Sequence, residues 1–101
     1  MTSIREYTLK KYFATLTIAN KHWTDEQRMK FSASMFNAFG AEEVNGYDNL
    51  FTFERKGYAK EEVFRFIQVY VGIALQAAGI IAADYYLNLS NTRGYNIHIT
   101  V

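Results

Sequence analysis

The longest uncharged stretch of the sequence, FIQVYVGIALQAAGIIAA from Phe66 to Ala83, limits the folds that this chain can adopt. Its 18 residues approach the length of a transmembrane helix, so it is a membrane span, a buried helix or two joined elements. At about 100° per residue, a polar seam runs into it from the charged residues upstream. The seam consists of Glu61, Arg65, Gln68, Gly72 and Gln76. A lipid-facing helix would not carry such a seam, so we predict a helix of a soluble domain, buried on about three sides.

The same stretch also contains a helix end. Gly79 suits the left-handed position that follows the last helical residue. The residues after it, IIAADYYLNLS, alternate with the period of a strand. The pattern places on one face Ile81, Ala83, Tyr85, Leu87 and Leu89. The uncharged stretch is therefore predicted to be a helix followed by a core strand.

A strand and a helix are predicted near the N-terminus. The segment from Lys10 to Ala19 alternates, and its inward set is Tyr12, Ala14, Leu16 and Ile18. Thr24-Asp25-Glu26-Gln27 then matches a capping box, which predicts a helix from there to Phe39, ended by Gly40. Its polar face holds Glu26, Lys30, Ser34 and Asn37. Apolar residues cover most of the remaining surface, namely Met29, Phe31, Ala33, Met35, Phe36 and Phe39.

A hairpin is predicted in the middle of the chain, in AEEVNGYDNLFTFERK. Asn45-Gly46 is the dipeptide best suited to the two positive φ angles of a type I′ turn. In the second strand, Phe51 and Phe53 are predicted to face the core. The opposite face then carries Leu50, Thr52 and Glu54.

The order of these elements predicts one α+β domain over residues 1–101. It is a ferredoxin-like β-α-β-β-α-β arrangement, with two helices on one face of an antiparallel sheet. A turn at Asn91–Gly94 and the alternating residues Tyr95–Val101 predict an added C-terminal hairpin strand. The face without helices would show Phe13, Thr15, Thr17, Thr52, Asp84, Tyr86, Asn88, Asn96, His98 and Thr100.

Composition excludes several kinds of chemistry. The chain has no cysteine and two histidines, so we expect no disulfide, no metal site and no cofactor. The net charge of +1 does not indicate the positively charged surface that binds the phosphate backbone of a nucleic acid. The N-terminus, MTSIREYTLKKY, is charged and lacks an apolar signal region, so we expect a cytoplasmic protein without a membrane segment.

One short motif carries potential chemistry. His98 and Thr100 lie two apart on a predicted strand and could hold a phosphate together. His98-Ile99-Thr100 resembles one of the two His-x-Thr signatures of the 2H phosphoesterases, in which two His act as acid and base. A second copy, His22-Trp23-Thr24, falls at the predicted helix cap, and the aligned strand position Phe13–Leu16 has no His. A phosphoesterase using His98 and Thr100 is therefore an alternative to a non-enzymatic function.

A single-stranded nucleic-acid or nucleotide-binding domain is a second alternative. A ferredoxin-like sheet with aromatic residues on its open face is typical of the RNA-recognition motif. However, NLFTFERKG does not match the basic, glycine-containing pattern of that family, and the charges are balanced. Nucleic-acid binding stays open without a motif to support it.

The favoured hypothesis is a small non-enzymatic protein-binding module. Both helices are apolar over wider arcs than one sheet face can bury, which predicts a protein partner and a homodimer formed by the helix spanning Val63–Ala78 or by an edge strand. An inhibitor of a host defence complex, carried by a phage or mobile element, would suit this size. The candidate binding residues include an acidic patch, which could mimic phosphates toward a nucleic-acid-binding target. They are Glu42, Glu43, Asp48 and Glu54 of this patch, with Tyr86 and His98.

Overall fold

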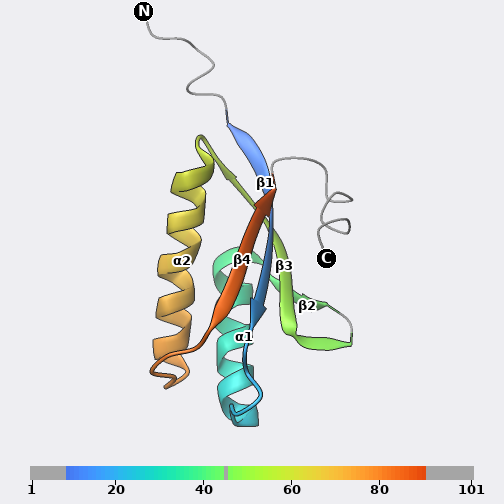
Figure 1. Ribbon diagram of the computed structural model, residues 1–101, viewed down its shortest axis with the longest axis vertical. Coiled ribbons are helices and arrows are strands. Elements are labelled where there is room, and N and C mark those ends of the chain that lie inside the picture. Colours follow the sequence, from blue (N-terminus) through green and yellow to red (C-terminus); the bar gives the residue numbers. More distant parts are fainter. Residues whose placement is uncertain (1–8, 45, 91–101) are drawn as a thin grey trace, which may run out of the picture.

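The computed structural model describes residues 9–44 and 46–90. The elements in chain order are β1 (Lys10–Ile18), α1 (Asp25–Phe39), β2 (Glu42–Val44), β3 (Tyr47–Gly57), α2 (Lys60–Ala77) and β4 (Tyr85–Ser90). Within these residues the strands form one antiparallel sheet in the order β2-β3-β1-β4, and α1 and α2 pack against it (Figure 1). The predicted ferredoxin-like α+β fold is confirmed. The predicted strand Tyr95–Val101 lies outside the described residues.

The core lies between the sheet and the helices, and β1 provides its centre. The predicted inward residues Tyr12, Ala14, Leu16 and Ile18 are each at most 2% exposed. Their neighbours on β3 and β4 complete the apolar layer with Phe51, Phe53, Leu87 and Leu89. Alternation along each strand therefore separates a buried face from an open one, as predicted.

Helix α1 begins and ends where the sequence predicts. The Thr24 hydroxyl accepts a hydrogen bond from the Gln27 backbone N–H at 3.1 Å, and the Gln27 side chain accepts one from the Thr24 N–H at 2.9 Å. Gly40 follows the last turn with φ of 68°. Phe31 and Met35 are buried, whereas Met29 and Phe36 are exposed. The apolar arc of α1 is thus wider than the surface that the core covers.

The hairpin between β2 and β3 is also present. Val44 pairs with Tyr47, and Gly46 has φ of 87°. Asn45, the other residue of the predicted turn, lies outside the described residues. The register shifts between Glu43 and Val44, as at a β-bulge. β2 is consequently short, and β3 is the long strand that carries Phe51 and Phe53 into the core.

Helix α2 differs from its prediction in how deeply it is buried. The polar seam of Glu61, Arg65, Gln68, Gly72 and Gln76 is exposed, as predicted. Next to it, however, Phe66, Val69 and Ile73 are 38%, 56% and 51% exposed. The prediction of burial on three sides is wrong, because within the described residues α2 packs mainly on α1, β3 and β4, which leave these apolar side chains exposed.

The chain after α2 corrects a second prediction. Gly79 has φ of 76°, and the backbone N–H groups of Gly79 and Ile80 donate to the carbonyl oxygens of Gln76 and Leu75 at 3.0 and 2.9 Å. This is a Schellman ending, in which the residue after the glycine packs back onto the helix. Ile80 is therefore buried and Ile81 fully exposed, and β4 begins only at Tyr85.

Candidate functional site

The open face of the sheet is organised in rows of residues that the strand register places side by side. Thr15 on β1 lies between Thr52 on β3 and Asn88 on β4. Farther along β1, Thr17 lies between Leu50 and Tyr86. Because paired residues point to the same side of a sheet, each row presents its side chains together on the face that the helices leave open.

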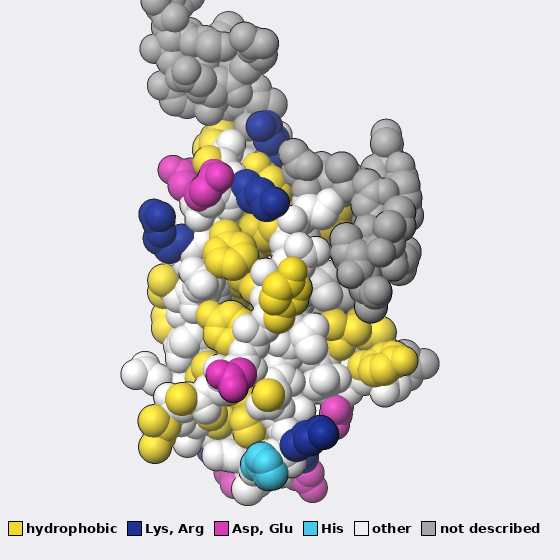
Figure 2. All heavy atoms as spheres, viewed as in Figure 1, with side chains coloured by type: hydrophobic (Ala, Val, Ile, Leu, Met, Phe, Trp, Pro, Cys, Tyr) yellow, Lys and Arg dark blue, Asp and Glu magenta, His cyan; other side chains and the backbone are white. Residues whose placement is uncertain are grey.

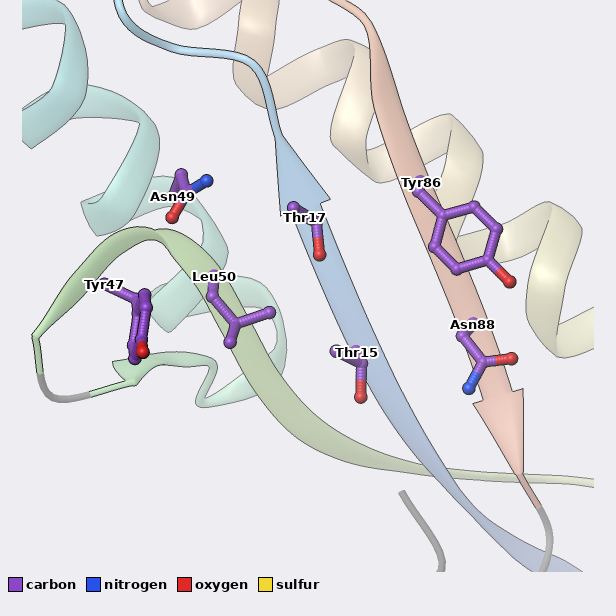
Figure 3. A pocket seen from close by; sticks show the side chains of 7 residues that line it. All are labelled: Thr15, Thr17, Tyr47, Asn49, Leu50, Tyr86 and Asn88. Carbon is purple, nitrogen blue, oxygen red and sulfur yellow. The ribbon is translucent and has the colours of Figure 1, made fainter. Parts of the chain in front are cut away.

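These rows enclose a hollow of about 360 Å³. Figure 3 shows the threonines of β1 on its floor, with side chains of β3 on one side and of β4 on the other. The lining residues are Thr15, Thr17, Tyr47, Asn49, Leu50, Tyr86 and Asn88. Every one of them is uncharged at neutral pH, so the hollow combines apolar surface with hydroxyl and amide groups.

The uncharged character extends beyond the hollow. In Figure 2, apolar side chains mixed with uncharged groups occupy the middle of the visible face, and Lys, Arg, Asp and Glu lie mainly toward its two ends. Tyr47 and Tyr86 project from β3 and β4 with 60% and 67% of their surface exposed. The face therefore presents tyrosine rings to the surroundings over a neutral background.

The side-chain hydroxyl of Thr15 is buried and makes no hydrogen bond within the described structure. A buried hydroxyl without a partner has lost its water and gained nothing in return. Thr15 is thus a residue whose presence at the floor of the hollow costs stability.

The four predicted acidic residues do not form one patch. Glu42 pairs with Thr52 and so lies on the open face, where Glu54 makes an ion pair with Lys11 at 3.5 Å. Glu43 is on the helix side, where the Ser32 hydroxyl donates to its carboxylate at 3.4 Å. Sheet alternation separates Glu42 from Glu43, because neighbours along a strand point to opposite faces.

Asp48 belongs to a network that joins the ends of β1, α1 and β3. Its backbone carbonyl accepts a hydrogen bond from the Asn20 side chain at 3.1 Å, and its carboxylate lies 4.0 Å from Arg28. Arg28 also pairs with Asp25 at 3.0 Å and donates to the Asn20 carbonyl at 3.2 Å. The contacts of Asp48 therefore belong to this network and not to a patch shared with the other acidic residues.

Of the other predicted site residues, Tyr86 lines the hollow and His98 lies outside the described residues, as does Thr100. The second His-x-Thr copy is not on a strand. His22 lies in the loop after β1, and the Thr24 hydroxyl is engaged in capping α1. Among the described residues no group of three or more His, Cys, Asp or Glu could hold a metal ion.

The sequence did not indicate that Tyr47 and Asn49 line the hollow with Leu50. Strict alternation would place Tyr47 and Leu50 on opposite faces, since they are three residues apart. Both nevertheless line the hollow, because the register shift against β2 leaves extra residues on β3 between Tyr47 and Phe51, and strict alternation is lost there. No local sequence signal marks such an irregularity.

Comparisons with protein-family models, with curated proteins and with solved structures found no match to this chain. In the described part of the chain, neither helix is long and apolar enough to cross a membrane.

Proposed function

We propose that the protein is a non-enzymatic module that binds another protein through the open face of its sheet. The observation that supports this is the neutral hollow of the open face, flanked by the exposed rings of Tyr47 and Tyr86. The centres of protein interfaces are depleted of charge and enriched in tyrosine. Tyrosine combines a large apolar ring with a hydroxyl that tolerates water, so it can be exposed before binding and buried afterwards.

The lining chemistry favours binding over catalysis. Hydroxyl, amide and apolar groups line the hollow, and its described lining residues include no carboxylate, histidine or lysine that could transfer a proton near neutral pH. A phosphoesterase remains the alternative that depends on His98 and Thr100. Its test is hydrolysis of phosphodiesters and cyclic nucleotides by wild type and His98→Ala, where loss of measurable turnover in the variant would favour the enzyme.

Single-stranded nucleic acid is the alternative for the same face, with the tyrosines as stacking platforms. It has weaker support because the part of the chain that the structure describes places no cation in the lining of the hollow to meet a phosphate. Binding of an oligonucleotide that weakens steeply with added salt would favour this alternative.

A second copy of this chain is the partner that we propose for α2. Phe66, Val69 and Ile73 form an exposed apolar stripe on its outer side. Exposed apolar stripes of this kind commonly mark self-association. Sedimentation at tens of micromolar should give a dimer for wild type and a monomer for Ile73→Ser, while Gln76→Ser, on the polar seam, should stay dimeric. A monomeric wild type would contradict the dimer and leave the open-face proposal intact.

A cytoplasmic inhibitor that covers a surface of a host defence complex, as phages and mobile elements carry, is one form that such a module takes. Its support is the neutral, tyrosine-bearing open face. It needs no catalytic group, because occupying the surface of the target is sufficient.

The open-face proposal is tested by capture of partners with matched tyrosine variants. Tyr86 lies on the open face, whereas Tyr58, exposed to a similar degree, follows β3 away from the hollow. In the capture experiment, a partner that uses the open face should be retained by wild type and by Tyr58→Ala and lost by Tyr86→Ala. Calorimetry with the purified partner should give similar affinities for wild type and Tyr58→Ala and a lower affinity for Tyr86→Ala. A partner that binds all three proteins equally would refute the open face as the binding surface.

A further inference from the structure

We propose that the hollow on the open face receives one aromatic side chain of the partner protein, a tyrosine or a tryptophan. This inference rests on the proposed function and specifies what the partner inserts. Four properties of the hollow support it: the spacing of its walls, its volume, its lack of charge and its polar groups.

The register fixes the width of the hollow. Leu50 and Tyr86 both pair with Thr17, so they lie on the two strands that flank β1 in the same row. With strands about 4.8 Å apart, their Cα atoms are roughly 10 Å apart. A ring in van der Waals contact with both walls needs about 7 to 8 Å. The gap therefore admits one flat ring and is too narrow for two stacked rings.

The volume of about 360 Å³ agrees with this width. Pockets for drug-sized ligands run from about 300 to about 1,000 Å³, so this hollow is near the lower limit. It is large enough for one bulky side chain and too small for a folded segment. Residues that fill such pockets at protein interfaces are most often tryptophan, tyrosine or arginine.

The lack of charge selects among these residues. Among the described residues no Asp or Glu lines the hollow, so an arginine would be desolvated there without a counter-ion from them. A nucleobase would bring its phosphate, and no Lys or Arg of residues 9–44 and 46–90 lines the hollow to neutralise it. A neutral aromatic side chain requires neither an acidic counter-ion nor a cation in the lining.

The polar groups favour tyrosine and tryptophan over phenylalanine. Asn49 and Asn88 offer amide groups on opposite sides, and Thr17 offers a hydroxyl on the floor (Figure 3). A phenol O–H or an indole N–H needs one hydrogen-bond partner when it is buried. Tyr86 lies in the row of Thr17 on the β4 side of the hollow, so the substitution Tyr86→Ala removes the largest side chain on that side.

The probes are N-acetyl-tryptophanamide and N-acetyl-tyrosinamide, titrated into the full-length chain and followed by backbone amide NMR. Saturable shifts are expected at Thr15, Thr17, Tyr86 and Asn88, with dissociation constants on the order of millimolar, because one side chain carries limited binding energy. Tyr86→Ala should weaken both probes about fivefold, and Tyr58→Ala should leave them unchanged. N-acetyl-lysinamide and N-acetyl-glutamate should not bind.

Three results would overturn the inference. The first is an absence of saturable shifts at these residues in the full-length chain, whatever occupies the hollow. The second is binding of adenosine or uridine there more tightly than either aromatic amide, which would make the hollow a base site. The third is equal binding by wild type and Tyr86→Ala. A protein partner that still depends on Tyr86 in the capture experiment would preserve the proposed function after any of these results.

Discussion

The two faces of the sheet are built from the same strands and have opposite properties. Along β1, Tyr12, Ala14, Leu16 and Ile18 are buried under the helices. The residues between them, Thr15 and Thr17, line the hollow on the other side. Adjacent positions thus have different roles, since the inner face supplies the apolar burial that stabilises the fold and the outer face contributes little to that burial.

The two faces should contribute differently to the free energy of unfolding. Removing an inner side chain loses its transfer free energy and leaves a cavity, whereas removing an exposed outer one loses little. Substitutions at neighbouring positions should therefore separate stability from binding. The following predictions test that separation from the largest effect to the smallest.

The largest effect is expected at Leu16, which is fully buried at the centre of the inner face. Leu16→Ala should lower the free energy of unfolding by about 2 to 5 kcal/mol, because it creates a cavity that the packed sheet and helices cannot close. The matched outer variant, Thr17→Ala, should change it by less than about 1 kcal/mol. Urea denaturation measures both, and similar losses in the two variants would refute the division between the faces.

The next effect is expected at Gly57, at the end of β3. A Cβ placed there would overlap with Cγ2 of Val63, a buried residue of α2. A β-branched side chain in a helix has one strongly preferred rotamer, so Val63 cannot turn away. Gly57→Ala should destabilise by about 1 to 3 kcal/mol in thermal or urea unfolding.

The control for Gly57 is its neighbour Lys56, which is exposed. Lys56→Ala should change stability by no more than about 0.5 kcal/mol. If Gly57→Ala lowers the free energy of unfolding no more than Lys56→Ala does, α2 does not pack as closely on the end of β3 as described.

A third substitution should act in the opposite direction. Thr15→Val replaces the buried, unpartnered hydroxyl with a methyl group and keeps the β-branched shape that strands favour. It should raise the free energy of unfolding by roughly 1 kcal/mol, measured by urea denaturation. A loss of stability would mean that the hydroxyl has a partner, and Thr15 would then belong to the structural residues.

The smallest effect is expected for the ion pair at the end of the open face. Lys11 and Glu54 are 3.5 Å apart, with side chains 52% and 51% exposed. Exposed pairs contribute little because water and salt screen them. Glu54→Gln should change stability by less than about 0.5 kcal/mol at physiological salt. A larger loss of stability that disappears at high salt would show that charges on the outer face contribute to the stability of the fold.

The fold was largely predictable because its signals are local. Alternation identified the buried residues of β1 and β3, and a capping box with Gly40 bounded α1. The failures concern burial. The extent of burial around α2 depends on where neighbouring elements lie, and periodicity within one segment does not contain that information. Ile81 is exposed because the chain turns at Gly79 and β4 begins only at Tyr85.

The candidate site was predictable only in part. Tyr86 and the threonines of β1 were assigned to the open face from strand period, and they line the hollow. The acidic residues were grouped because they are close in sequence, and the sheet separates them between its two faces. Tyr47 joins the hollow through an irregularity in β3 that follows from pairing with β2.

The sequence by itself determined the elements, their ends and the alternation that divides each strand into an inner and an outer side. These features follow from backbone geometry, capping and the free energy of burying apolar groups, which act over a few residues. The tertiary structure alone decided which outer residues meet. The register of three strands brings Leu50, Thr17 and Tyr86 into one row, and a hollow exists only where side chains distant in the sequence are held at a fixed separation.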